Sequence, residues 1–370
     1  MTQSIVLSPH HKSMILLSRM LLLPIKEETM YSSTVSSLKF EVQSMGWEEF
    51  TSFIELGSTN HVLVRGLEVL LSLLLDGDDV RIGWAETALA TERGRIETAL
   101  GVLSSICQAF AARRYDLTVI KSLDHWPDLG SDLDLYTNTD SGEASRLMKT
   151  RFNAQIAPQS WGDRLAGKWN FMIPGLPEAV EIHMGRLGQT GEQAVIAAQV
   201  ASRSRLVSVG NWEFRVPSAS DRIMISTLQR MYRHFYFRLC DVLDSAALVE
   251  CGEVDFEDLR KSAEAADIWE GVATYLVIVS DYVAKYRGFG LNLPQYVRAA
   301  AAFGGDKVIF GNGYLRVPLI PQSSRLYLSQ LAGLLQKREL QNGARLSLLP
   351  LLATAAVVGQ KFTGSDKGIW

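Results

Sequence analysis

Two aspartates, Asp132 and Asp134, stand one residue apart in the stretch "SDLDLYT", among apolar neighbours. In a strand, residues two apart point to the same side, so both carboxylates face one way while Leu133 and Leu135 face the core. Carboxylates this close resist joint ionisation. A hard divalent cation such as Mg²⁺ relieves the repulsion and leaves positions for phosphate oxygens and water. The pair therefore indicates a metal site for phosphate chemistry, with a solvated strand face as the alternative.

A short strand and a loop of defined length precede this pair. "DLTVIKSL" is rich in β-branched residues, as strands are, and ends at Lys121 and Ser122. Nine residues, 123–131, then lead to Asp132 and include a turn that ends in Gly130 and Ser131. The unit is thus a strand, a Lys-Ser turn, a loop, and a strand that carries both acids.

The elements around this unit change in period along the chain. Residues 38–75 and 84–114 have helical spacing, with Leu89, Ile96, Leu100 and Phe110 among the repeated apolar positions. Residues 115–187 alternate between short strands and one helix, and from residue 218 onward the pattern is almost entirely helical. We expect an α/β (α+β) fold: a small mixed sheet flanked by N-terminal helices and a mainly helical C-terminal domain. The expected divisions are 1–80, 81–215 and 216–370.

Over its full length, "IKSLDHWPDLGSDLDLYTN" resembles bacterial nucleotidyltransferase family proteins, within the superfamily typified by DNA polymerase beta and kanamycin nucleotidyltransferase. The resemblance covers roughly residues 85–250. Like that bacterial group, the chain has a lysine, Lys121, where the superfamily usually has glycine. This departure affects how a triphosphate is held, and a lysine there would supply positive charge to it.

The resemblance implies a third carboxylate on a later strand, and "AVEIHMG" fits this expectation. Val180, Ile182 and Met184 alternate there with Glu181 and His183. Glu181 would then join the aspartates. His183 shares its face and would contact substrate, orient Glu181, or make a structural hydrogen bond.

The implied activity is metal-dependent transfer of a nucleoside monophosphate from an NTP, expected to be ATP, with release of pyrophosphate. Asp132, Asp134 and Glu181 would be catalytic and would bind Mg²⁺ or Mn²⁺, as two ions about 3.5–4 Å apart. Lys121, Ser122, Gly130 and Ser131 would contact the phosphates. The acceptor would be a hydroxyl or phosphate of a small molecule, peptide or protein.

Basic residues follow at four-residue steps in the segment expected to form one helix after residue 218. They are Arg230, His234 and Arg238. We expect Arg230 and His234 to face the nucleotide, and Arg238 to pair with Asp241 or Asp244 on a solvated face.

Overall composition restricts the remaining possibilities. The net charge of -3 argues against a nucleic-acid partner. The three cysteines are widely spaced without a C-x-x-C pair, so we expect idle thiols in a reducing compartment. The apolar run 346–359 is shorter than the ~20 residues that span a bilayer. A cytoplasmic protein is expected, with peripheral membrane contact as the alternative for this run.

Two other functions compete with the transferase. An inactive nucleotidyltransferase fold could act as a binding or regulatory module. The presence of all three predicted carboxylates disfavours this alternative, and the Lys121 departure keeps it open. A metal-dependent glycosyltransferase also uses an Asp-x-Asp pair, but it needs a doubly wound α/β domain before the motif. Helical spacing at residues 38–114 argues against that domain.

Overall fold

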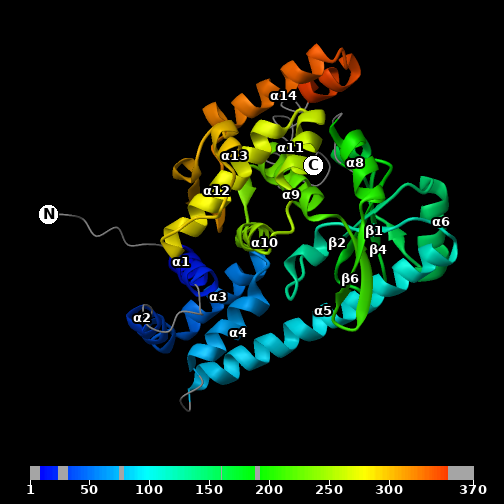
Figure 1. The fold of residues 1–370 in the computed structure, drawn as a ribbon. Coiled ribbons are helices and arrows are strands. Elements are labelled where there is room, and N and C mark those ends of the chain that lie inside the picture. Colours follow the sequence, from blue (N-terminus) through cyan, green and yellow to red (C-terminus); the bar gives the residue numbers. More distant parts are fainter. Residues whose placement is uncertain (1–8, 24–31, 75–78, 160, 188–191, 349–370) are drawn as a thin grey trace, which may run out of the picture.

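The computed structural model describes residues 9–23, 32–74, 79–159, 161–187 and 192–348 (Figure 1). Five helices precede the first strand: α1 (Pro9–Leu22), α2 (Ser32–Gln43), α3 (Trp47–Thr59), α4 (Leu63–Leu74) and α5 (Val80–Ala112). The 33-residue helix α5 begins where the side chain of Asp79 accepts a hydrogen bond from the backbone N–H of Arg81. The helices expected between residues 38 and 114 are confirmed, and α5 runs alongside the strands in Figure 1.

A five-stranded mixed sheet follows in the order β1-β2-β5-β4-β3. Its members are β1 (Thr118–Val119), β2 (Asp132–Thr137), β3 (Gln155–Ile156), β4 (Lys168–Met172) and β5 (Ala179–Met184). Strand β2 pairs in parallel with β5, and β4 pairs antiparallel with β5. Helices η1 (Ser122–His125), α6 (Ser141–Phe152) and α7 (Trp161–Ala166) lie between the strands. The predicted mixed α/β fold is therefore confirmed.

The rest of the described chain is mainly helical, with two small sheets. Strands β6 (Arg205–Val209) and β7 (Trp212–Val216) form a hairpin, and β8 (Tyr236–Phe237), β10 (Tyr314–Arg316) and β9 (Ile309–Gly311) form a second sheet. The helices are α8 (Glu192–Ser202), α9 (Ala219–Thr227), η2 (Leu228–His234), α10 (Leu239–Glu250), α11 (Phe256–Ala265), α12 (Trp269–Arg287), α13 (Gln295–Ala300), η3 (Gly305–Lys307), η4 (Leu319–Ser323) and α14 (Ser324–Gln336).

The prediction of one helix running on from residue 218 is wrong. Helix α9 passes into the π-helical segment η2, which ends at Phe235 with a φ of 56°. Strand β8 then pairs with β10, and Arg238 is extended before α10 begins. Helical spacing of apolar residues could not reveal this break because the partner strand lies about eighty residues later in the chain. Arg230, His234 and Arg238 therefore do not share one helix face.

Two hydrophobic clusters form the interior. One joins α1 to α5 with the five-stranded sheet and the hairpin, and the other lies mainly among α8 to α14. The first cluster includes residues on both sides of residue 80, so α4 and α5 pack into the same core as the sheet. The three-part division at residues 80 and 215 stays a prediction.

Among the described residues, no helix has both the length and the apolar character needed to cross a membrane. The predicted role of the apolar run 346–359 falls mostly outside the described residues, which end at 348.

Candidate functional site

The parallel register of β2 and β5 brings the predicted acids together. Asp134 is paired directly with Glu181, and Tyr136 with His183. Because β2 and β5 are neighbours, Asp134 and Glu181 project side by side from the sheet. Single ligand atoms of Asp134, Glu181 and His183 all lie within 4.8 Å of one another. These three side chains offer two carboxylate oxygens and an imidazole nitrogen to a cation.

Asp132 belongs to the same electrostatic environment, although it is not in that group of three. Burial, together with the negative charges of Glu181 and Asp134, raises the pKa of Asp132 to about 6. Its carboxylate accepts a hydrogen bond from Ser131 Oγ at 3.3 Å. Ionisation of Asp132 is thus opposed by burial and by its two acidic neighbours.

Two lysines neutralise part of this negative charge. Lys121 Nζ forms an ion pair with Oδ1 of Asp134, and Lys168 Nζ lies 2.8 Å from Oε1 of Glu181. Burial disfavours the charged form of Asp134, but Lys121 and His183 outweigh it and hold the pKa of Asp134 below its usual range. Burial also opposes the charge on Lys168, yet Glu181 raises the pKa of this lysine. Lys168 is therefore charged at neutral pH.

Lys168 is a site residue for which no definite role could be predicted from the sequence. It lies on β4 opposite His183 and also contacts Oδ1 of Asp163, at 3.1 Å. In the sequence, Lys168 begins a short strand-like segment that shortly precedes "AVEIHMG". Which edge of β5 this strand joins depends on the order of the strands in the sheet, which local sequence does not reveal.

His183 lies on β5, two residues after Glu181. Its Nε2 is 3.8 Å from Oδ1 of Asp134, and its Nδ1 has no hydrogen-bond partner among the described residues. Burial lowers the pKa of His183, which keeps the imidazole neutral. A neutral imidazole has a lone pair free to bind a metal ion or accept a proton.

The Lys-Ser turn holds the strand that carries the acids. Ser122 N donates to Ile120 O at 2.7 Å, and Lys121 between them has φ 63° and ψ -56°. This is a γ-turn, a strained conformation for any residue with a side chain. Ser122 Oγ accepts from Asp134 N at 2.7 Å and donates to Asp132 O at 3.1 Å. The Ser122 hydroxyl is therefore engaged with the backbone of β2.

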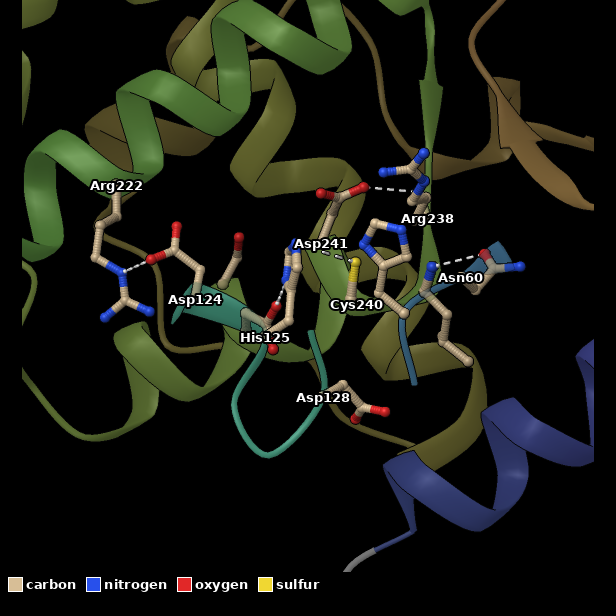
Figure 2. A network of polar contacts seen from close by, with 12 residues as sticks. Asn60, Asp124, His125, Asp128, Arg222, Arg238, Cys240 and Asp241 are labelled. Atoms are coloured by element: carbon tan, nitrogen blue, oxygen red, sulfur yellow. Dashed lines mark hydrogen bonds and ion pairs between the residues drawn. The ribbon is translucent and has the colours of Figure 1, made fainter. Parts of the chain in front are cut away.

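The loop between Ser122 and Asp132 is fixed by contacts with helices. Arg222 Nε lies 2.6 Å from Oδ1 of Asp124, which links the loop to α9 (Figure 2). Arg95 of α5 donates to the carbonyl oxygens of Leu129 and Gly130. A Cβ atom at Gly130 would lie 3.0 Å from the ring of His61, so a larger residue would require this ring to shift by a few tenths of an ångström.

The predicted basic residues of segment 230–238 take different positions. Arg230 is buried at 2% exposure, and its Nε lies 2.7 Å from Oδ2 of Asp241. Burial, with the positive charges of Arg233, Arg230 and Lys121, holds the pKa of His234 well below its usual value. The backbone N of Arg238 donates to Asp241 at the start of α10.

Arg233 was missed in the sequence. The positive charge of Arg233 repels that of Lys168 and lowers the pKa of Lys168, so the two side chains lie close enough to interact. Its Nε has no hydrogen-bond partner among the described residues. The sequence "RMYRHF" contains no pattern that would have identified Arg233 as a site residue, because its position depends on where η2 ends, at Phe235.

Comparisons with known proteins identify one similar solved structure. The chain matches no family model and no curated protein. Among solved structures it is similar to the crystal structure of an antigenic nucleotidyltransferase-like protein from Paracoccidioides brasiliensis, with 12% identity and a TM-score of 0.30. That likeness covers 46% of this chain and 90% of the other. At this TM-score it carries no argument about the site.

Proposed function

We propose that this protein is a Mg²⁺-dependent nucleotidyltransferase that transfers a nucleoside monophosphate from an NTP to a hydroxyl or phosphate group and releases pyrophosphate. The observation that carries the proposal is the side-by-side pairing of Asp134 on β2 with Glu181 on β5, with Lys121 of the Lys121–Ser122 turn forming an ion pair with Asp134. The acceptor is a small molecule, peptide or protein, and a cytoplasmic location with access to ATP is part of the proposal.

The donor set suits a divalent cation on charge as well as geometry. Asp132, Asp134, Glu181 and Asp163 carry four negative charges when ionised, and Lys121 and Lys168 carry two positive charges. The remaining two negative charges match one Mg²⁺, which prefers carboxylate oxygens and keeps positions for phosphate. Asp134 and Glu181, with Asp132, would hold the ion. Mg²⁺ bound there supplies charge neutralisation for the phosphates and the leaving pyrophosphate.

The residues of the chain then divide the remaining tasks. Lys121, displaced from Asp134 by the cation, would donate to the triphosphate, and Arg233 and His234 would approach it from η2. Glu181, at the side of the acceptor, would take the proton of the attacking hydroxyl. Lys168 keeps Glu181 oriented through the contact at 2.8 Å. Catalysis on this scheme is mainly positioning and electrostatic stabilisation.

A label-transfer assay tests the proposal. Purified protein is incubated with each NTP labelled at the α-phosphate and with Mg²⁺ or Mn²⁺, with and without cell extract. We expect transfer of label to the protein or to an extract component, and loss of transfer in Asp134→Asn. The matched control is Glu97→Gln, which removes an exposed acid of α5. Absence of transfer with every NTP and extract would count against the enzyme.

A second function, an NTP-binding module without turnover, is favoured by one observation. Lys121 already pairs with Asp134, so this site has an internal cation that a transferase must displace. Metal-dependent NTP binding that disappears in Asp134→Asn, without label transfer, would identify the binding module. The glycosyltransferase alternative is disfavoured, because it needs an α/β domain before the Asp-x-Asp motif. The described residues between Pro9 and Ala112 are instead helical apart from short connections.

A further inference from the structure

A second cluster of metal-ligand side chains lies apart from the paired acids. Single ligand atoms of His61, His125 and Cys240 are all within 4.8 Å of one another. Cys240 Sγ lies 3.9 Å from His125 Nε2, and Figure 2 shows these two residues side by side. The rings of His61 and His125 meet edge to face, with centroids 5.2 Å apart. Two imidazoles and one thiol form the donor set that zinc prefers.

The cluster is buried and one of its nitrogens has no partner. His61 is 9% exposed, His125 is 9% exposed and Cys240 is fully buried. Nδ1 of His61 has no hydrogen-bond partner among the described residues. A buried nitrogen without a hydrogen-bond partner destabilises the fold unless a bound group satisfies it. A metal ion is such a group.

The surrounding contacts are those of a metal-binding histidine. His125 Nδ1 lies 2.6 Å from Oδ2 of Asp244, which leaves Nε2 directed at Cys240. Metal-bound histidines commonly donate their second ring N–H to a carboxylate, which fixes the ring and its tautomer. Arg65 in turn holds Asp244 and Asp128, at 2.7 and 2.8 Å. The ring of His125 is therefore held in orientation by Asp244, which is itself held by Arg65.

Asn60 holds the other two residues of the cluster, His61 and Cys240, in position relative to each other. Its side-chain oxygen accepts from Leu239 N at 2.9 Å, and its backbone oxygen accepts from Cys240 N at 3.3 Å. Asn60 and His61 are adjacent at the end of α3, so these two bonds bring His61 to the start of α10. Tetrahedral zinc with ordinary bond lengths needs a nitrogen–sulfur separation of about 3.6 Å. The observed 3.9 Å is close to it.

We propose that His61, His125 and Cys240 bind one Zn²⁺ ion, with a water molecule as fourth ligand. Binding replaces the thiol proton of Cys240 by a zinc–sulfur bond, and the proton leaves to solvent. The ion would join α3, the loop that leads to the paired acids, and α10. The inference does not depend on the proposed transferase, because none of its ligands is among the paired-acid residues.

Metal analysis and cobalt spectroscopy test the site. The full chain, purified from zinc-supplemented cells, should contain about one zinc per chain, and Cys240→Ser or His61→Gln should lose it. Cys251→Ser removes an exposed thiol and is the matched control, which should keep the zinc. Co²⁺ added to the metal-free protein should give a thiolate charge-transfer band that Cys240→Ser lacks. Asp134→Asn should keep this band, because its carboxylate belongs to the paired-acid site.

A variant that retains only Cys240 guards against a folding failure of Cys240→Ser. In Cys107→Ser/Cys251→Ser, a cobalt–thiolate band can come only from Cys240. A chelator should lower the melting temperature of this variant and leave that of Cys240→Ser unchanged. No cobalt–thiolate band in the variant, or equal zinc content in the wild type and Cys240→Ser, would overturn the proposal. The cluster would then be a hydrogen-bonded core network.

Discussion

The ammonium group of Lys121 forms an ion pair with Asp134 across a γ-turn in which Lys121 itself has a φ of 63°. Both side chains are largely buried, at 15% and 12% exposure. Glycine would adopt this turn without strain, which agrees with the glycine usual in the superfamily that the motif resembles. Glycine, however, could bring no charge to Asp134. The lysine thus accepts backbone strain and supplies a cation.

Two substitutions at Lys121 separate the backbone strain from the charge. Lys121→Gly and Lys121→Ala both remove the ammonium group, but only alanine keeps a Cβ atom in the positive-φ turn. We expect the glycine variant to be more stable than the alanine variant by about 1–2 kcal/mol. Urea unfolding measures both free energies. Equal stability of the two variants would show that the turn is not strained.

Asp132 should make the protein less stable as pH rises. Its pKa is raised to about 6 in the folded protein, against about 3.9 in the unfolded chain. Between these values the unfolded chain has lost the proton while the folded protein still holds it, so ionisation weakens folding as pH rises from about 4 to about 6. Asp132→Asn should therefore be more stable than the wild type at pH 7, by about 1–2 kcal/mol after allowance for partial exposure.

The comparison requires metal-free protein, because a bound cation would stabilise the ionised carboxylate. Guanidinium unfolding in chelator at pH 3.5 and pH 7 gives the two free energies for each protein. The stabilisation should be small at pH 3.5, where Asp132 is protonated in both states. A variant less stable than the wild type at pH 7 would contradict the prediction.

Asp134 should show the opposite sign, although it is only two residues away. Its pKa is depressed, chiefly by Lys121 acting against burial, so its contribution to stability is present above the unfolded pKa and is lost in acid. Asp134→Asn leaves a buried ammonium group without its partner, and we expect a loss of about 3 kcal/mol at pH 7. The same unfolding series should show the loss shrinking below pH about 4.

Lys168 should compete with a divalent cation for Glu181. Lys168→Met removes the ammonium group 2.8 Å from Oε1 of Glu181 and keeps most of the aliphatic stem. We expect tighter Mg²⁺ binding and weaker label transfer, since the site gains negative charge but loses the group that orients Glu181. Isothermal titration measures the affinity. Lys149→Met, on the exposed face of α6, is the control and should change neither property.

Arg230 should prove a stabilising residue of the interior. Its guanidinium lies 2.7 Å from Asp241 and over the ring of Tyr236, at 5.5 Å from the centroid. Arg230→Met leaves Asp241 buried without its cationic partner, with an expected loss of about 3–5 kcal/mol. The double variant Arg230→Met/Asp241→Leu should recover much of that loss. If NTP binding fell while stability stayed unchanged, the predicted nucleotide contact would be supported instead.

The sequence by itself determined the local elements. Period-two alternation in "DLDLYT" and "AVEIHM" placed Asp132, Asp134, Glu181 and His183 on strands, and apolar spacing placed the long helix α5. These patterns are local because a strand or helix presents its residues at fixed intervals to a nearby core. The mixed α/β fold followed from the order of such elements.

Only the tertiary structure decided which side chains meet. The pairing of Asp134 with Glu181 depends on the register of β2 against β5, and the contact of Lys168 depends on β4 lying at the other edge of β5. His61, His125 and Cys240 come from three segments separated by 64 and 115 residues, as the chain numbering gives. No local period links such residues. Their meeting is set by helix packing and by Asn60, whose hydrogen bonds join the end of α3 to the start of α10.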